Sequence, residues 1–303
     1  MVKKYFAVLL LPLALLVFSL SSSTGNAADA VADPSKGFIG AITCKDCHEK
    51  QYETYRQSVH SQKHVKGPES QDACETCHGA GAAHVEKGGG RGVDTFAFEK
   101  EAGHTAEEIT EVCFKCHANT PRMTYWDMGN HKKSDVACTT CHVLHGPPRP
   151  PNQLAVCFDC HRGIKSAVDK LSRHPVKEGK VKCSDCHDVH GSMYKVMVKT
   201  ETVNMLCYSC HADKRGPFVW QHAPVEENCM ACHNAHGSSR ESLLVSRVPV
   251  LCNDCHSGIG TDHRMLVVTP DMTNARVTGQ RSCLKCHNNI HGSANFSGSY
   301  LRN

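Results

Sequence analysis

The pattern of apolar and polar positions changes once, near the start of the chain. An apolar run without any charge extends from Phe6 to Leu20, after Lys3 and Lys4, and small residues that end at Ala27 follow it. A basic start, a short apolar run and a small-residue cleavage site indicate a secretory signal peptide, which we assign to residues 1–27. The run has about fifteen residues, whereas a membrane-spanning helix needs ~20. We therefore expect an exported protein; a retained N-terminal anchor is the alternative.

Beyond that run, apolar positions occur only in short stretches. The leads LAVC, NMLC and PVLC each predict one helical turn at a cysteine motif. The longest helical pattern is AEEITEVCFKCH at 106–117, where Thr105 and Glu108 form a potential capping box. The stretches GGGRG at 88–92 and GPPRPPN at 146–152 predict loops. The predicted fold class is mostly coil with short α-helices and almost no β-sheet.

The charge balance excludes one class of partner. Without residues 1–27 the chain keeps 32 basic and 30 acidic residues, a net charge of +2, and no basic block. We therefore expect no nucleic-acid binding.

The 20 cysteines of this 303-residue chain would suggest disulfides in an exported protein, but their spacing indicates otherwise. Every cysteine belongs to one of ten C-x-x-C-H units, and none is left over. The units contain Cys44 and Cys47, Cys74 and Cys77, Cys113 and Cys116, Cys138 and Cys141, Cys157 and Cys160, Cys183 and Cys186, Cys207 and Cys210, Cys229 and Cys232, Cys252 and Cys255, and Cys283 and Cys286.

C-x-x-C-H is the attachment motif of c-type haem, in which two thiols bond the porphyrin and the histidine binds the iron. Zinc sites and thioredoxin-like redox pairs are the alternatives. Ten cysteine pairs would all precede a histidine by chance at a frequency of roughly 10⁻¹². We therefore predict ten covalently bound haem c groups. The remaining 276 residues give about 28 per haem, so the porphyrins themselves should form the core.

The motif histidines are the predicted proximal iron ligands: His48, His78, His117, His142, His161, His187, His211, His233, His256 and His287. Twelve other histidines remain, two more than ten second axial ligands require. The predicted distal ligands are His60, His84, His131, His145, His174, His190, His222, His236, His263 and His291. His64 competes with His60, and His104 has no counterpart elsewhere and should be exposed.

The positions of these histidines divide the chain into five dihaem modules. Even-numbered motifs are closely followed by a histidine, His-Gly in four cases, whereas odd-numbered motifs are followed by one at a longer gap. A repeat of this kind predicts an elongated array of stacked units. The predicted modules are 28–112, 113–156, 157–206, 207–251 and 252–303.

The spacing also limits which iron each distal histidine can reach. His190 follows His187 by three residues, too few to pass round a porphyrin to the other face of the same iron. We expect it to bind the haem at Cys157 and Cys160 instead. His174 would then bind the haem at Cys183 and Cys186, although a longer loop could return it to its own haem. Histidine on both sides leaves an iron that only changes its oxidation state, at a low potential.

Over nearly its whole exported length the chain resembles the periplasmic decahaem cytochromes of the MtrA/PioA/DmsE type. The resemblance is strongest in CSDCHDVHGSM, CYSCHADKRGPFVWQHAPVEENCMACHNAHGS and RSCLKCHNNIHGS. The segments SVHS and CHGAGAAH also resemble the family's first module, which favours His60 and His84 as ligands.

The resemblance implies a place in an outer-membrane β-barrel porin. The family passes electrons between periplasmic or inner-membrane c-type cytochromes and an extracellular multihaem cytochrome, mineral or terminal reductase. A free periplasmic electron shuttle and a multihaem reductase are the alternatives; the reductase would need an open haem. The sequence does not distinguish metal reduction from Fe(II) oxidation.

Overall fold

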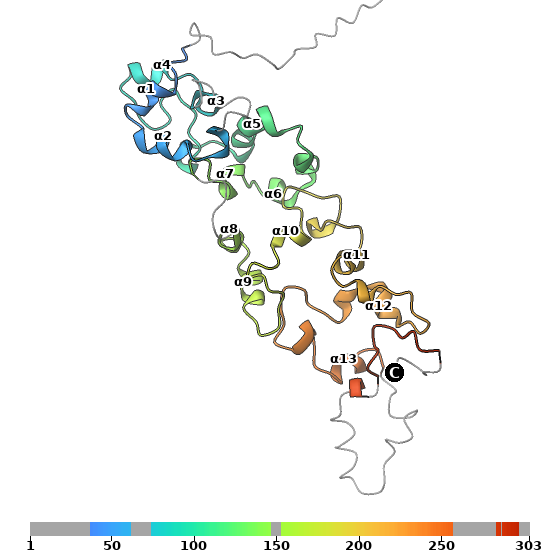
Figure 1. The fold of residues 1–303 in the computed structure, drawn as a ribbon. Coiled ribbons are helices and arrows are strands. Elements are labelled where there is room, and N and C mark those ends of the chain that lie inside the picture. The colour runs from blue at the N-terminus through green and yellow to red at the C-terminus, as the bar shows by residue number, and fades with distance from the viewer. Residues whose placement is uncertain (1–36, 62–73, 147–152, 257–282, 286, 297–303) are drawn as a thin grey trace, which may run out of the picture.

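The computed structural model describes residues 37–61, 74–146, 153–256, 283–285 and 287–296, and these form an elongated body (Figure 1). Elements follow one another along it roughly in chain order, from α1 (Ala41–Lys45) at one end to α13 (Val250–Asn253) near the other. The predicted signal peptide and most of the loop at 146–152 lie outside the described residues. Within the described part, no helix combines the length and apolar character that crossing a membrane requires.

The secondary structure consists of short helices, as predicted. The longest, α5 (Ala106–His117), begins at Thr105, whose hydroxyl accepts from the Glu108 amide while the Glu108 carboxylate accepts from the Thr105 amide. This confirms the predicted capping box. The other α-helices are α2 (Glu49–Tyr55), α3 (Glu75–His78), α4 (Ala82–Glu86), α6 (Asn130–Lys133), α7 (Cys138–Cys141), α8 (Gln153–Phe158), α9 (Arg162–Val168), α10 (Cys183–Cys186), α11 (Val203–Tyr208) and α12 (Ala223–Glu227).

Short 3₁₀ turns complete the helical content. They are η2 (Val59–Ser61), η3 (Lys100–Ala102), η4 (Pro121–Met123), η5 (Trp126–Met128), η6 (Lys195–Met197), η7 (Ala212–Lys214), η8 (Cys229–Ala231), η9 (Glu241–Leu243) and η11 (Cys283–Lys285). Strands are absent from the described residues, which carry only isolated bridges such as Ser172 with Ser238. The prediction of short helices with almost no sheet is therefore confirmed.

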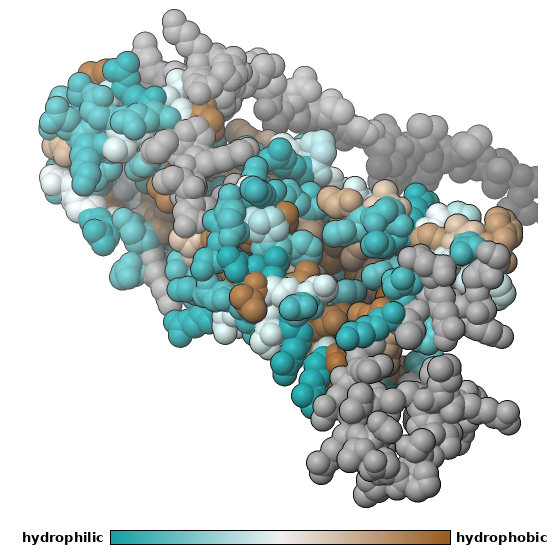
Figure 2. All heavy atoms as spheres, turned by 60° about the horizontal axis from the view of Figure 1, so that its bottom comes forward, coloured by the Kyte–Doolittle hydropathy of each residue, from teal (hydrophilic) through white to brown (hydrophobic). Residues whose placement is uncertain are grey.

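The polypeptide itself supplies a thin apolar core. Among the described residues the buried hydrophobic side chains are few and mostly small, with Ile109 and Trp126 the largest, and none of large volume is fully enclosed. Hydrophilic residues cover most of one face, and the hydrophobic ones gather toward its middle (Figure 2). A chain of this length normally buries far more apolar surface.

At two of the His-Gly pairs, an earlier segment of the chain packs directly against the glycine. Gly191 has φ 130° and Gly237 has φ 149°, a region that side chains disfavour. A Cβ atom at Gly191 would collide with the Tyr125 carbonyl, and one at Gly237 would collide with the Ala167 carbonyl. The glycine after each of these histidines therefore lets the preceding segment approach closely.

A buried asparagine fastens α11 to the following motif. Asn204 is 6 % exposed, and its side-chain amide donates to the carbonyls of Val225 (2.8 Å) and Glu226 (2.9 Å). Its oxygen accepts from the Cys229 amide at 2.7 Å. The side chain thus fixes the eighth motif against the helix that carries the seventh.

We predict that Asn204→Ala destabilises this region by at least about 2 kcal/mol, because the partly buried Cys229 amide and two carbonyls lose their partner. Chemical denaturation of the holoprotein measures the loss, and Asn253→Ala, at an exposed position of α13, is the matched control. Equal unfolding midpoints for the two variants would contradict this role.

Candidate haem-binding sites

The described cysteine motifs form tight turns, in which the amide of the motif histidine donates to the carbonyl of the first cysteine. In the sixth motif the His187 amide donates to the Cys183 carbonyl at 2.9 Å, and in the ninth the His256 amide donates to Cys252 at the same distance. The apolar leads predicted to start a helix at the motifs do so in α8, α11 and α13. This geometry allows two thioether bonds and one axial bond to a single porphyrin.

Nine of the motif histidines face a second histidine from elsewhere in the chain. The ring centroids of each pair are separated by 6.0–6.3 Å. The pairs are His48 with His84, His78 with His145, His117 with His60, His142 with His190, His161 with His131, His187 with His236, His211 with His174, His233 with His291, and His256 with His222.

This separation fits an iron atom between the two rings. Imidazole nitrogen bonds a first-row transition metal at about 2.0–2.1 Å. With about 1 Å from each nitrogen to its ring centre, two such bonds place the centroids about 6 Å apart. The spacing and the neighbouring thiols therefore fit c-type haem.

The pairing links motifs from different predicted modules. The histidine of an even-numbered motif faces the histidine that closely follows the next even-numbered motif. His142 of the fourth motif faces His190, and His187 of the sixth motif faces His236. An odd-numbered motif faces a histidine from the preceding module, as His161 faces His131. The first motif differs, because His48 faces His84 of its own module.

The structure contradicts two expectations about the partners of these histidines. His190 lies opposite His142, so it faces the motif at Cys138 and Cys141 and not the one at Cys157 and Cys160. His174 lies opposite His211 and not opposite His187. In the described part of the chain, eight of the nine facing histidines come from another predicted module, and His84 alone faces a motif of its own module.

Three histidines had an open assignment: His60 and His64, which compete for one ligand position, and His104, which has no counterpart. His60 faces His117, whereas His64 lies outside the described residues. His104 stacks on Phe96 with the ring centroids 4.0 Å apart and is 31 % exposed, so it is less exposed than expected. No histidine is recorded opposite it in the described part of the chain. Cys286 and the predicted distal ligand His263 also lie outside that part.

The thiols of successive motifs meet alternately through their first and their second cysteines. A hydrogen bond between first cysteines links Cys113 to Cys138 and Cys157 to Cys183. It raises the pKa of Cys113 and of Cys157, and it lowers the pKa of Cys138 and of Cys183 to about 6. The remaining first-cysteine contacts are Cys44 with Cys74, Cys207 with Cys229 and Cys252 with Cys283.

Between modules, the second cysteines of successive motifs lie near enough to influence one another electrostatically. Burial, and then the charge of the neighbouring thiol, raises the pKa of Cys77 beside Cys116 and of Cys232 beside Cys255. Cys141 lies beside Cys160 and Cys186 beside Cys210 in the same way. The motifs therefore follow one another in space in their sequence order.

Burial keeps many of the facing histidines neutral. It lowers the pKa of seven of them, with the charge of a neighbouring histidine as a smaller cause: His60, His142, His145, His190, His222, His236 and His291. The neutral imidazole is the form that binds a metal.

Backbone carbonyls orient several rings through the other nitrogen. His78 Nδ1 bonds the Phe96 carbonyl at 2.7 Å, and His84 Nδ1 bonds the Val93 carbonyl at 2.8 Å. His131 and His174 bond the carbonyls of Val189 and Ala235, the residues before His190 and His236. A hydrogen bond at Nδ1 leaves Nε2 free to bind the metal and raises its basicity. Sequence reasoning missed these acceptors, because a backbone carbonyl has no signature in the sequence.

Three family models match the chain. One described as "Doubled CXXCH motif" matches residues 174–216 and 222–261. One described as "Cytochrome c-type protein NrfB-like" matches 74–153, and one described as "Cytochrome c554 and c-prime" matches 43–73.

Two relatives extend the likeness to most of the chain. The multihaem cytochrome MtrA of Shewanella baltica is 38 % identical over 274 residues, which cover 87 % of this chain and 81 % of MtrA. The C-type polyhaem cytochrome OmcB of Geobacter sulfurreducens is 23 % identical over 297 residues, 82 % of this chain but only 36 % of OmcB.

The motifs, the fold and these matches define a multihaem c-type cytochrome, a class of protein that binds haem covalently and transports electrons. The chain belongs to the family of the multihaem cytochrome MtrA.

Proposed function

We propose that the protein binds ten haem c groups, each between two histidines, and conducts electrons along them. The paired histidines support this most directly, because nine pairs share one centroid separation across unrelated stretches of chain. The tenth pair would be His287 with His263. Each bound haem supplies a one-electron Fe(III)/Fe(II) couple, and two imidazoles favour a low potential.

The residues around each proposed site support electron transfer without substrate binding at the iron. The two facing imidazoles would occupy both axial positions, so neither water nor a substrate could bind the iron. Cysteines that lie close together from one motif to the next, such as Cys113 with Cys138 and Cys141 with Cys160, would place neighbouring porphyrin edges near one another. The sites would therefore form one continuous conductor in motif order, and we propose no catalytic site.

Binding of the haem of one module by a histidine of another module would make the conductor rigid. Each proposed haem in the middle of the chain is bonded to one module through its thiols and to another through its distal histidine. Five short modules with a thin apolar core would thus be held together by covalent and coordination bonds. The modules 28–112, 113–156, 157–206, 207–251 and 252–303 would then act as a single body.

We propose that this body lies inside an outer-membrane β-barrel porin and is reached from the periplasm. Its elongated form suits a conductor across a hydrocarbon layer ~30 Å thick, and a barrel would separate it from lipid (Figure 1). Its partners would be periplasmic or inner-membrane c-type cytochromes on one side and an extracellular multihaem cytochrome or terminal reductase on the other. Membership of the MtrA family supports this arrangement over a free periplasmic shuttle.

Co-expression of the protein with a candidate porin tests this proposal. The expected result is a stable complex that, in liposomes, reduces an enclosed dye by electrons from an external donor. His104→Ala should leave that rate unchanged, since His104 faces no recorded histidine. A fully haem-loaded protein that neither binds the porin nor reduces the dye would contradict the conduit and favour the shuttle.

A further inference from the structure

Two segments after the His-Gly pairs fold into the same loop. The first follows His190-Gly191 at residues 192–198, and the second follows His236-Gly237 at residues 238–244. In each, the serine hydroxyl accepts from the amide two residues later and donates to the carbonyl six residues later.

Ser192 Oγ lies 3.1 Å from the Tyr194 amide nitrogen and 2.6 Å from the Val198 carbonyl oxygen. For Ser238 the distances are 2.9 Å to the Arg240 amide and 2.5 Å to the Leu244 carbonyl. We name these two loops the serine braces.

Each serine brace contains two residues in a backbone conformation that side chains avoid. Val196 and Met197 have φ of 50° and 54°, and Ser242 and Leu243 have φ of 53° and 60°. None of the four is glycine, and valine is especially disfavoured there because it branches at Cβ. Such strain persists only where surrounding contacts impose it.

The strained residues direct a carbonyl at a motif histidine. The Val196 carbonyl accepts from His187 Nδ1 at 3.0 Å, and the Ser242 carbonyl accepts from His233 Nδ1 at 2.8 Å. Backbone bonds close the arrangement: the Asp188 amide donates to the Met197 carbonyl at 2.7 Å, and the Asn234 amide donates to the Leu243 carbonyl at 2.8 Å. The brace therefore ties a strained turn directly to the ring of a proposed proximal ligand.

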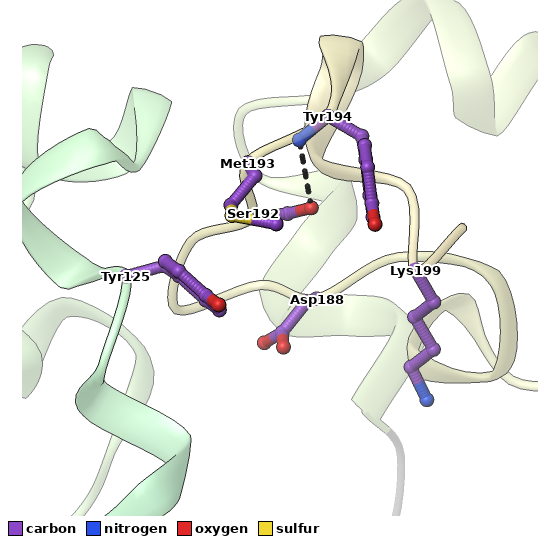
Figure 3. A pocket seen from close by; sticks show the side chains of 6 residues that line it. All are labelled: Tyr125, Asp188, Ser192, Met193, Tyr194 and Lys199. Carbon is purple, nitrogen blue, oxygen red and sulfur yellow. Dashed lines mark hydrogen bonds between the residues drawn. The ribbon is translucent and has the colours of Figure 1, made fainter. Parts of the chain in front are cut away.

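Figure 3 shows the first brace, with the Ser192 hydroxyl bonded to the Tyr194 amide beside a hollow of about 400 Å³. In the second brace, an earlier module adds support, because the Leu243 amide donates to Ser172 Oγ at 2.9 Å. A third serine, Ser293, follows His291-Gly292 and accepts from the Asn295 amide at 3.2 Å. The second module has Pro147 in this position, which has no hydroxyl.

We propose that Ser192 and Ser238 are positioning residues that lower the potentials of the haems at the sixth and eighth motifs. Their hydroxyls hold the strained turn, and the turn holds the carbonyl on the histidine Nδ1. A histidine that donates strongly at Nδ1 is more basic at Nε2 and stabilises the ferric state of its iron. The sequence H-G-S would then mark low-potential sites, and the second module would lack one. This inference rests on the proposed axial roles of His187 and His233.

The test is a spectroelectrochemical titration of holoprotein carrying Ser238→Ala. One component in ten should shift to higher potential, with an altered low-spin EPR signal and no high-spin haem. Ser239→Ala, at the exposed neighbouring residue, is the matched control and should leave every component in place. Ser192→Ala repeats the test in the other brace, should Ser238→Ala fail to fold.

The outcomes separate this inference from the proposed function. If Ser192→Ala and Ser238→Ala leave all potentials and EPR signals unchanged in a fully low-spin protein, the braces are only structural and the inference fails. A wild-type holoprotein with high-spin haem at the sixth or eighth motif would instead contradict the proposed axial ligands.

Discussion

His190→Ala should convert one haem in ten to the high-spin state, and that haem should be the one at Cys138 and Cys141. The ring of His190 lies 6.0 Å from that of His142 with an interplanar angle of 17°, so its loss opens one face of that iron. Because the site lies in the middle of a single series of motifs, dye reduction through the porin complex should fall sharply as well. EPR of the purified variant counts the open haem, and a structure of the variant identifies it.

Two further variants distinguish ligation from a general disturbance. His190→Met should restore a low-spin haem at a raised potential, because a histidine–methionine pair favours the ferrous state more than two histidines do. His104→Ala removes a histidine that stacks on Phe96 and should leave all spectra unchanged. An open iron at Cys157 and Cys160 after His190→Ala would show that the histidines pair within modules.

Glu75→Ala should cause the largest loss of stability at the N-terminal end. Glu75 is 3 % exposed, and its carboxylate accepts from the amides of Ile39 (3.0 and 3.2 Å), Gly40 (2.9 Å) and Gly81 (2.8 Å). Removing it leaves three amide donors without a partner, at about 1–3 kcal/mol each where they are buried. The expected cost is at least about 3 kcal/mol, which lowers the melting temperature of the holoprotein by several degrees.

The matched control for this prediction is Glu86→Ala, at an exposed position at the end of α4. Glu75→Gln keeps one acceptor oxygen and should fall between Glu75→Ala and the wild type. Differential scanning calorimetry of the holoprotein measures all three variants. If Glu75→Ala and Glu86→Ala have the same melting temperature, Glu75 is not the residue that mainly holds residues 39–40 in place.

Local features of the structure could be predicted from the sequence because short-range contacts determine them. The helix at 106–117 follows from the capping box of Thr105 and Glu108, and the helical turns at the cysteine motifs follow from their apolar leads. The scarcity of sheet follows from the same short segments. These features depend on residues a few positions apart.

The partner of each histidine could not be predicted in the same way. The three-residue gap between His187 and His190 correctly excludes a shared iron, but it does not select among the neighbouring motifs. The preference for the other motif of the same module was wrong, because His190 faces His142 of the preceding module. Long-range contacts such as His131 Nδ1 with the Val189 carbonyl, 58 residues away, depend on this pairing between modules.

Ser192 and Ser238 do have a signal in the sequence. Each ends an H-G-S segment, and these segments recur at equivalent positions after His190 and His236. Glu75 gave no such signal, since it occupies a variable position of the second motif and its partners Ile39 and Gly40 lie 35–36 residues earlier.

The central claim, that every haem is closed by two histidines, is tested most directly by an EPR spectrum of the purified, fully haem-loaded protein. The account predicts low-spin ferric signals alone, with the intensity of ten haems. A high-spin signal equivalent to one whole haem would contradict it, because an iron open to ligands would be available for catalysis.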